Sequence, residues 1–335
     1  MSDVRFGIIM LPEDLTTFGD RCRQVEQAGY AMLGVADSQS VFRELYVALT
    51  VAALSTERIP FGPQVTNPVS RHLVVTASGM SSVDEVSGGR AVLGIGSGDS
   101  ALYTMGAPPS RLAGLEDSIE TIRTLTTGEA VVREGQVWHV RRARRRIPIY
   151  LAAEGPRTLR LAGRVADGVV VGLGLSPEVV KLSLEHLAAG AAEAGRRVED
   201  LDVWFLAKTN LAETREAAIG PIKMALAASA NHAFRFTLAG KALPSELHDA
   251  VRGLQRGYQS HQHEVIGAAN AALTDTFGLT DYLAERFAFA GPADDCLRQV
   301  ERAAEAGARQ FLVTSFVEAP ERFIDRWAAE VMARL

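Results

Sequence analysis

A run of glycines followed by an acidic residue is the stretch of this sequence with the clearest capacity for chemistry. Residues 90–101 read Arg-Ala-Val-Leu-Gly-Ile-Gly-Ser-Gly-Asp-Ser-Ala, so an apolar run from 91 to 95 leads into Gly96, Gly98 and Asp99. A short apolar run of this kind is typical of a strand buried on both faces. Glycine leaves the backbone bare where the strand ends, so a flat or anionic ligand could approach it. The alternative is that the glycines only let the strand turn into a loop.

Other polar or glycine-containing segments follow predicted strands at the same relative position. They are Asp37 with Ser38, residues 64–67, 97–100, 153–155 and 172–174, and Thr209 with Asn210. They contain no Gly-x-Ser-x-Gly elbow, no His-x-x-x-His pair and no carboxylates at a metal-binding spacing. Glycines, hydroxyls and amides suit a large flat cofactor that supplies the chemistry itself. A metal-dependent hydrolase would need more histidine and carboxylate, so we expect no metal.

The elements that position these segments are short apolar strands that alternate with helical patterns. The predicted strands are 4–11, 30–35, 59–66, 91–95, 147–152, 168–171, 201–208 and 310–315. About eight β-α units favour a (β/α)8 TIM barrel, in the α/β class, over an open doubly wound sheet. The loops after the strands of such a barrel gather at one rim, so the segments described above are expected to meet in space.

The alternation is interrupted twice. Residues 129–146 predict a β-hairpin, and the arginines between 141 and 146 are expected to form a solvated surface rim. Residues 231–290 are irregular and predict a helical insertion after the seventh strand. No break in composition marks a second domain, so residues 1–335 are expected to form a single barrel domain with this variable insertion.

Composition and charge narrow the possible partners. The chain has 335 residues, of which 47% are hydrophobic and 22% charged, with a net charge of -5, which is an ordinary soluble composition without a basic field for nucleic acid or membrane. Cys22 and Cys296 lie in helical patterns and are expected to be inert packing cysteines. No run reaches the ~18 apolar residues of a membrane span, and no signal peptide is recognisable. We therefore expect a cytoplasmic protein that binds a small-molecule substrate.

Several segments, taken together and in order, resemble one protein family. They are 66–72 (Thr-Asn-Pro-Val-Ser-Arg-His), 87–100, 149–156, 161–163 and 166–168, with a weaker match at 291–294. Through these segments the chain resembles the bacterial luciferase-like flavin and deazaflavin oxidoreductases. The resemblance is strongest to the branch of the F420-dependent methylenetetrahydromethanopterin reductases, and the matching segments span nearly the whole chain.

The resemblance implies roles for the rim residues. It places a non-prolyl cis peptide at Gln64–Val65 behind the cofactor's central ring, Asp37 near the pyrimidine side, and Ser97, Gly98 and Asp99 on the substrate side. The implied catalytic residues are Asp99, Ser38 and Asp37. The implied cofactor-binding residues are Asp37, Gln64, Val65, Thr66, Asn67, Ser97 and Gly98, with Ala153, Glu154, Gly155, Gly172, Leu173 and Gly174 at the ribityl phosphate. As alternatives, Asp37 and Asp99 could cap helices and Asn67 could shape a turn.

The chain departs from some members of the family, and its histidines leave alternatives open. The F420-dependent sugar-phosphate dehydrogenases carry a histidine acid-base where this chain has Ser38 and a glutamate where it has Asp99, which argues against alcohol oxidation by their mechanism. His72 begins a predicted helix and suits either a structural role or a proton relay. His261 and His263 lie in the variable insertion, where the resemblance places substrate specificity.

Three functions follow from these observations. The first is hydride transfer from reduced F420 to a small organic substrate, with Lys181, Arg157 and Arg160 as possible contacts for the cofactor's anionic tail. The alternative is an FMN-dependent monooxygenase that uses reduced FMN and O2, which requires an apolar, water-excluding pocket. The third is a flavin-binding barrel without turnover. The family also implies a homodimer through residues 46–49 and 69–86, unless those helices are buried in the barrel's own helix ring.

Overall fold

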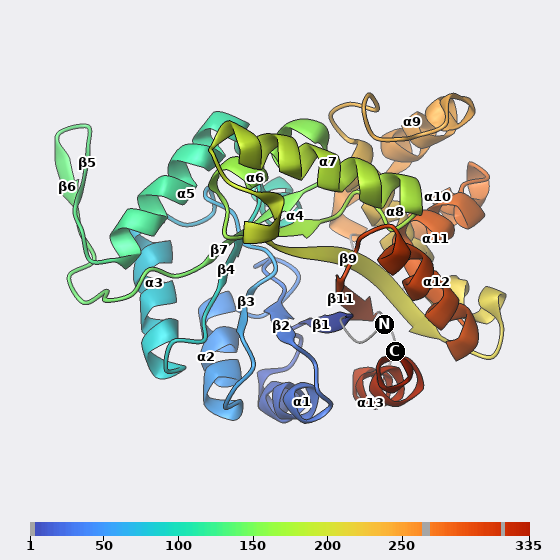
Figure 1. The fold of residues 1–335 in the computed structure, drawn as a ribbon, viewed down its shortest axis with the longest axis horizontal. Coiled ribbons are helices and arrows are strands. Elements are labelled where there is room, and N and C mark those ends of the chain that lie inside the picture. The colour runs from blue at the N-terminus through green and yellow to red at the C-terminus, as the bar shows by residue number, and fades with distance from the viewer. Residues whose placement is uncertain (1–3, 263–268, 316–318) are drawn as a thin grey trace.

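Parallel strands follow one another around a nearly closed barrel, with helices outside it (Figure 1). The computed structural model describes residues 4–262, 269–315 and 319–335. The barrel strands are β1 (Arg5–Met10), β2 (Met32–Val35), β3 (Phe61–Pro63), β4 (Leu93–Ile95), β7 (Ile149–Ala153), β8 (Gly168–Val171), β9 (Asp202–Leu211) and β11 (Gln310–Ser315). The (β/α)8 TIM barrel predicted from the sequence is confirmed.

The strands pair in the order β3-β2-β1-β11-β9-β8-β7-β4. Ile8 of β1 lies opposite Leu33 of β2 on one side and Val313 of β11 on the other, in parallel register. Isolated bridges from Phe61 to Ala91 and from Thr66 to Ile95 join the two ends of this order. The ring of strands therefore closes between β3 and β4, where few backbone hydrogen bonds are made.

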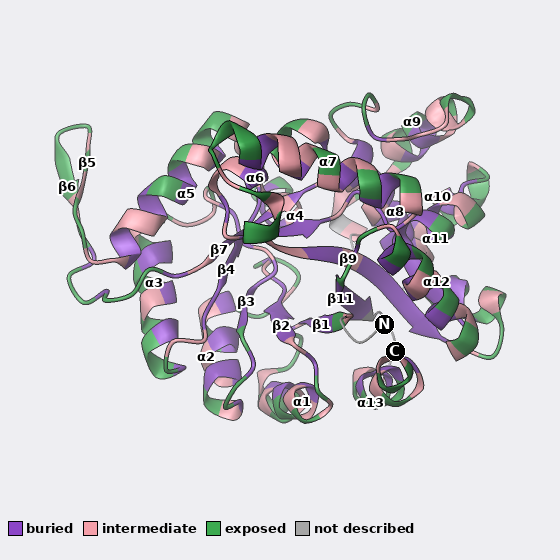
Figure 2. Ribbon diagram, in the orientation of Figure 1, coloured by how far each residue is buried: buried purple, intermediate pink, exposed green. Residues whose placement is uncertain are grey.

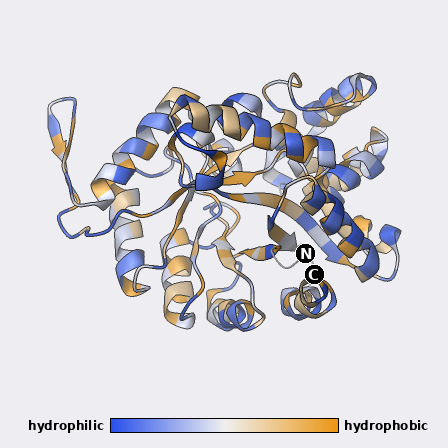
Figure 3. Cartoon of the chain, in the orientation of Figure 1, coloured by the Kyte–Doolittle hydropathy of each residue, from blue (hydrophilic) through white to orange (hydrophobic). Residues whose placement is uncertain are grey.

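Helices connect the strands and cover the outside of the barrel. They are α1 (Leu15–Gln27), α2 (Leu45–Ser55), α3 (Leu73–Val86), α4 (Ser100–Tyr103), α5 (Leu112–Thr126), α6 (Pro156–Val165), α7 (Pro177–Glu193), α8 (Arg215–Phe234), α12 (Ala293–Glu305) and α13 (Pro320–Glu330), with short 3-10 turns η1 (Val198–Asp200) and η4 (Met332–Arg334). Buried residues fill the strands and the inner faces of the helices (Figure 2), and hydrophilic residues alternate with hydrophobic ones along the outer helices (Figure 3). The cysteines Cys22 and Cys296 are buried and free, and burial raises the pKa of each thiol to about 12, which confirms their packing role.

The interior of the barrel holds a smaller cluster that includes Met32, Val92 and Leu312. Near the amino ends of the strands, the Asp202 carboxylate accepts hydrogen bonds from the Tyr150 hydroxyl at 2.7 Å and from the Trp204 indole N–H at 2.8 Å. Residues near the amino ends of parallel barrel strands usually serve stability. Asp202 also accepts a hydrogen bond from the Gln310 side-chain N–H of β11 at 2.6 Å, so it joins β7, β9 and β11 away from the rim.

The predicted hairpin is present as β5 (Val131–Arg133) and β6 (Gln136–Trp138), which project from the barrel (Figure 1). The arginines that follow it are exposed, and two of them pair with carboxylates of the barrel, Arg145 with Asp84 and Arg146 with Asp167. This confirms the solvated rim.

His72 has a structural role at the start of α3. Its Nδ1 accepts the Val74 backbone N–H at 3.2 Å, and its ring contacts the Trp138 ring of the hairpin at 4.6 Å between centroids. Of the two roles left open for this histidine, the structural one agrees with these contacts.

The segment between α8 and α12 contains η2 (Ser245–Leu247), α9 (His248–Gly257), η3 (Ser260–Gln262), α10 (Ala269–Thr276), α11 (Thr280–Phe287) and β10 (Ala288–Gly291). The described part of the predicted insertion is therefore mainly helical, with two corrections. The helix before it, α8, continues to Phe234, and the segment ends in a strand, because β10 pairs in parallel with the end of β9. Four residues are too few for a periodic pattern to reveal such a strand. His261 lies in η3, and His263 lies outside the described residues.

Candidate active site

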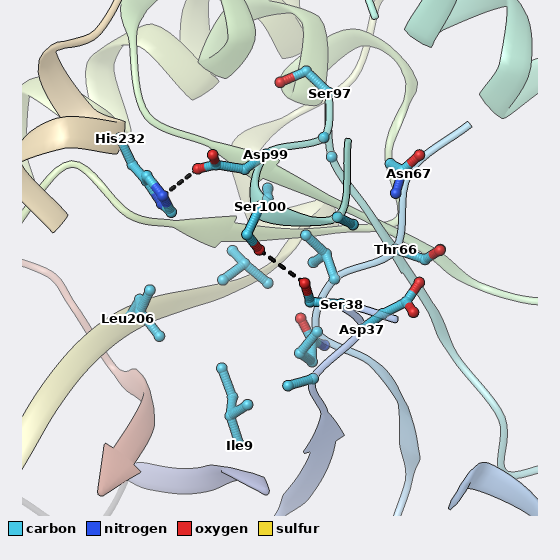
Figure 4. Close-up of a pocket in the computed structure, with 18 of the residues that line it drawn as sticks. Ile9, Asp37, Ser38, Thr66, Asn67, Ser97, Asp99, Ser100, Leu206 and His232 are labelled. Carbon is cyan, nitrogen blue, oxygen red and sulfur yellow. Dashed lines mark hydrogen bonds and ion pairs between the residues drawn. The ribbon is translucent and has the colours of Figure 1, made fainter. Parts of the chain in front are cut away.

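A pocket opens at the carboxyl ends of the barrel strands, where many of the predicted site residues meet (Figure 4). The predicted residues that line it are Asp37, Ser38, Gln64, Val65, Thr66, Asn67, Ser97, Gly98, Asp99 and Glu154. Its floor is apolar and includes Ile9, Val170 and Leu206 from the barrel interior. The expectation that segments far apart in sequence converge at one rim is confirmed for this set.

The loop after β4 carries Asp99 into the pocket. Gly98 has a φ of 97°, and a Cβ there would lie 2.3 Å from the Leu102 Cδ1 atom, so the loop requires glycine at this position. Asp99 occupies the N-cap position of α4, but among the described residues its carboxylate contacts His232 rather than the helix backbone. The capping alternative for Asp99 is therefore wrong.

Asp37, after β2, is bound by an arginine from the loop after β3. The Arg71 guanidinium approaches its two carboxylate oxygens at 2.7 and 3.1 Å, and Arg71 also lies 3.2 Å from Glu44 and 5.4 Å from the Tyr46 ring centroid. Burial opposes the charge of Arg71, but Asp37 outweighs it and raises the Arg71 pKa. Such a bidentate pair fixes orientation. Because Asp37 is bound in this way and Glu44 caps α2, the capping alternative for Asp37 is also wrong.

The neighbouring polar groups connect the rim loops. The Ser100 hydroxyl donates to the Ser38 hydroxyl oxygen at 3.1 Å, which joins the loops after β4 and β2. The Asn67 side-chain oxygen accepts the backbone N–H groups of Val69 and Ser70 at 3.0 and 2.8 Å, so Asn67 shapes a turn as well as lining the pocket. The Gln64–Val65 peptide is cis, as the family resemblance implies.

The segments assigned to a phosphate lie beside the pocket rather than in it. Among the described lining residues, Glu154 is present but Ala153, Gly155 and the segment 172–174 are not. The Arg286 guanidinium fills this region, because its Nε donates to the Leu173 carbonyl at 3.0 Å and its Nη2 donates to the Lys241 carbonyl at 2.6 Å. Phosphate binding by these segments stays a prediction.

Lys241 packs against the turn at Gly155. A Cβ on Gly155 would lie 3.4 Å from the Lys241 Nζ atom, and that ammonium donates to the Ala233 carbonyl at the end of α8. Burial lowers the pKa of Lys241 to about 8, although nearby Glu154 acts in the opposite direction. Sequence reasoning did not identify Lys241, since nothing in its spacing connects it with the strand ends.

The last turn of α8 forms one wall of the pocket. His232 Nε2 is in close contact with Asp99 Oδ2 (Figure 4), and His232 Nδ1 lies 4.0 Å from Glu154 Oε1. The next turn places Arg235 over the same loop, where it donates to the Ser97 hydroxyl oxygen at 3.0 Å and to the Gly98 carbonyl at 3.3 Å. Sequence analysis gave no role to His232 or Arg235, because only tertiary contact relates them to Asp99.

Opposing effects act on His232. Burial disfavours its charged form, but the Asp99 carboxylate and, more weakly, Glu154 outweigh burial and raise the pKa of His232 above its usual value. A cation in the last turn of a helix is also favoured by the helix dipole. The pocket therefore presents a carboxylate-bound imidazole, whose charged form is favoured by its neighbours, beside an apolar floor.

Within residues 4–262, 269–315 and 319–335, His, Cys, Asp and Glu side chains form no cluster of three or more suited to a metal ion. The helices in the same ranges include none with the length and apolar character to cross a membrane.

A parallel (β/α)8 barrel with a charged pocket at the carboxyl ends of its strands defines a barrel enzyme. The chain belongs to the luciferase-like monooxygenase family, whose sequence profile matches residues 4–310, and it is an oxidoreductase of that class. It is 31% identical over 325 residues to the 5,10-methylenetetrahydromethanopterin reductase of Methanolobus tindarius. This alignment covers 92% of this chain and 94% of the relative.

Two other relatives are informative. The structure of the coenzyme F420-dependent tetrahydromethanopterin reductase from Methanopyrus kandleri superimposes with a TM-score of 0.79 and 26% identity, over 99% of each chain. The F420-dependent glucose-6-phosphate dehydrogenase of Beutenbergia cavernae is 34% identical over 205 residues, which cover 55% of this chain and 61% of the relative.

Proposed function

We propose that this chain transfers a hydride between F420 and a small organic substrate at the rim pocket. The observation that carries the proposal is that Asp99 and the loops after β2 and β3 converge on one pocket above an apolar floor. Full-length similarity to 5,10-methylenetetrahydromethanopterin reductases supports F420 as the cofactor. The charged wall of Asp99 and His232 supports it over FMN with O2, since a monooxygenase requires an apolar, water-excluding chamber.

The residues present fit a flat heterocyclic cofactor. Ile9, Val65 and Leu206 offer an apolar surface to a ring, and hydroxyls and amides at the rim can bind its polar edges. When bound, F420 supplies two-electron hydride chemistry. Lys241 and the turn at 153–155 are the proposed phosphate contacts, because the Lys241 ammonium lies against the turn at Gly155 and its positive charge suits an anion.

Side chains of the protein have separate roles in the proposed reaction. Arg71 fixes Asp37 at the rim, and the bond between Ser100 and Ser38 holds two loops at a constant separation. The apolar side chains of the floor lower the local polarity beneath the pocket, which strengthens the electrostatic effect of Asp99 above it. The proposed catalytic residues are therefore Asp99, Ser38 and Asp37, with Asp99 nearest to the substrate.

A cofactor titration followed by a turnover assay tests this function. Quenching of F420 and FMN fluorescence by the purified protein measures which cofactor binds. Anaerobic oxidation of reduced F420 with 5,10-methylenetetrahydromethanopterin, and reduction of F420 with glucose 6-phosphate, then measure turnover. F420 binding with turnover supports the proposal. FMN binding with O2-dependent oxidation would favour the monooxygenase, and binding without any turnover would favour a non-catalytic barrel.

We also propose that the chain forms a homodimer through α2 and α3. These helices bury Ala48 and Leu49 within the barrel's own helix ring but leave Val47, Leu54 and Val75 exposed on the outside. Exposed aliphatic side chains on neighbouring helices suit an interface with a second copy. Light scattering of the wild type and of Val75→Asp checks this, and an unchanged mass would contradict it.

A further inference from the structure

We propose that His232, held by Asp99, is the acid that protonates the substrate, and that the substrate carries a C=O bond, a C=N bond or a methylene group bridging two nitrogens. This proposal rests on the proposed function, because it requires hydride transfer at the same pocket. It assigns a catalytic role to a helix outside the strand ends, and it narrows the substrate to compounds whose heteroatom gains a proton when the neighbouring carbon gains a hydride.

The geometry points to His232 through its contacts on both sides. The Nε2 atom of the imidazole contacts Asp99, which comes from the loop after β4, and the Nδ1 atom lies 4.0 Å from Glu154, which follows β7. The ring itself is partly exposed and lines the pocket (Figure 4). An imidazole oriented by a carboxylate and open to a pocket has the arrangement of a general acid.

The other polar groups of the pocket are less suited to this step. Asp37 is bound by the Arg71 guanidinium through both oxygens. Ser38 accepts a hydrogen bond from Ser100, and a serine hydroxyl does not release its proton near neutral pH. Histidine is the side chain whose ordinary pKa lies closest to neutrality.

The charged groups around His232 come from several elements. Asp99 and Glu154 face it from the barrel and favour its protonation, whereas Arg235 on its own helix opposes it. Lys208 of β9 lines the same pocket. The two carboxylates lie on the sides of the ring, so an imidazolium persists there to higher pH than an isolated histidine would allow.

The substrate carbon gains a hydride with its two electrons from reduced F420, and one bond between that carbon and its oxygen or nitrogen breaks: the π bond of a C=O or C=N group, or one C–N σ bond of a methylene group that bridges two nitrogens. The heteroatom takes the proton from the His232 imidazolium, which leaves a neutral imidazole beside Asp99. Oxidised F420 and the reduced substrate are the products, and water reprotonates the imidazole.

The test compares His232→Gln and His232→Ala with the wild type, and uses His248→Gln as the matched control. His248 begins α9 in the same segment of the chain, and its ring contacts the Leu243 carbonyl at 3.4 Å rather than the pocket. For each protein, F420 binding is measured by fluorescence quenching. Turnover with the two substrate pairs named above is measured from pH 5.5 to 9, and melting curves check folding.

We expect His232→Gln to bind F420 within about threefold of the wild type and to lose at least ~100-fold in kcat, the usual scale for a general acid. In the reductive direction the wild-type rate should fall as pH rises through the pKa of His232, and this limb should be absent from the variant. Added imidazole should restore turnover to His232→Ala, which a purely structural role would not allow. His248→Gln should behave as the wild type does.

Two results would overturn the proposal and are distinguishable. If the wild type turns over and His232→Gln keeps its rate and pH profile, the acid role is wrong while the proposed function stands. If the wild type shows no F420-dependent turnover with either substrate pair, the proposed function fails and the acid role fails with it.

Discussion

Replacing Arg71 with alanine should destabilise the protein far more than the loss of an exposed ion pair would. The Asp37 side chain is only 2% exposed and the Arg71 side chain 14%, so the substitution leaves a buried carboxylate without its bidentate partner. Removing one partner of a buried ion pair costs about 3–5 kcal/mol. Arg71 also stacks on Tyr46, and loss of that contact acts in the same direction. We therefore expect a loss of at least ~3 kcal/mol in the free energy of unfolding.

The same cluster supplies the control. Glu44 lies 3.2 Å from Arg71, but its side chain is 49% exposed, so Glu44→Gln should cost under ~1 kcal/mol. Glutamine also keeps a side-chain oxygen that can accept the Val47 N–H at the start of α2. Urea unfolding followed by circular dichroism gives both values. A loss below about 1 kcal/mol for Arg71→Ala would refute the idea that Asp37 depends on this guanidinium.

Three further predictions concern the pocket. Asp99→Asn should abolish turnover while F420 affinity, measured by fluorescence quenching, stays within about tenfold, or ~1.4 kcal/mol; unchanged turnover would contradict a catalytic Asp99. Because the pKa of His232 is raised in the folded state, its stabilising contribution is fully present below its ordinary pKa of about 6.5 and is lost as pH rises through the folded value. The difference in Tm between wild type and His232→Gln should therefore shrink at high pH, and a constant difference would exclude this linkage. Lys241→Met should weaken F420 binding about tenfold or more. The wild type should lose affinity for F420 as the pH rises above about 8, where Lys241 loses its charge, and the variant should not show this dependence. Equal affinities of wild type and variant would show that Lys241 does not contact the phosphate.

The barrel and most of the rim could be predicted because both follow from local patterns. Each strand is a short apolar run, and the fold alone brings the residues after it to one edge, which is how Asp99 and Asp37 were found. The cis peptide at Gln64–Val65 followed from family resemblance and is confirmed. These features need no knowledge of how distant segments pack.

The wall formed by α8 could not be predicted for the opposite reason. His232 and Arg235 lie more than 130 residues from Asp99 in sequence, and no periodicity relates the end of a long helix to a loop after β4. Burial of Lys241 and Arg286 depends on the same packing, so their position beside the segments assigned to phosphate was also missed. The strand β10 is too short to carry a pattern.

The position of His232 at the end of α8 has a consequence for how activity could change over evolution. The barrel loops carry Asp99 and the proposed contacts to the cofactor ring, whereas the proposed acid, His232, comes from the last turn of a helix. Alterations in that turn would change the substrate without disturbing the strands. Exchanging residues 231–235 between relatives, which leaves the proposed phosphate contact Lys241 in place, should accordingly change substrate choice with the same cofactor retained.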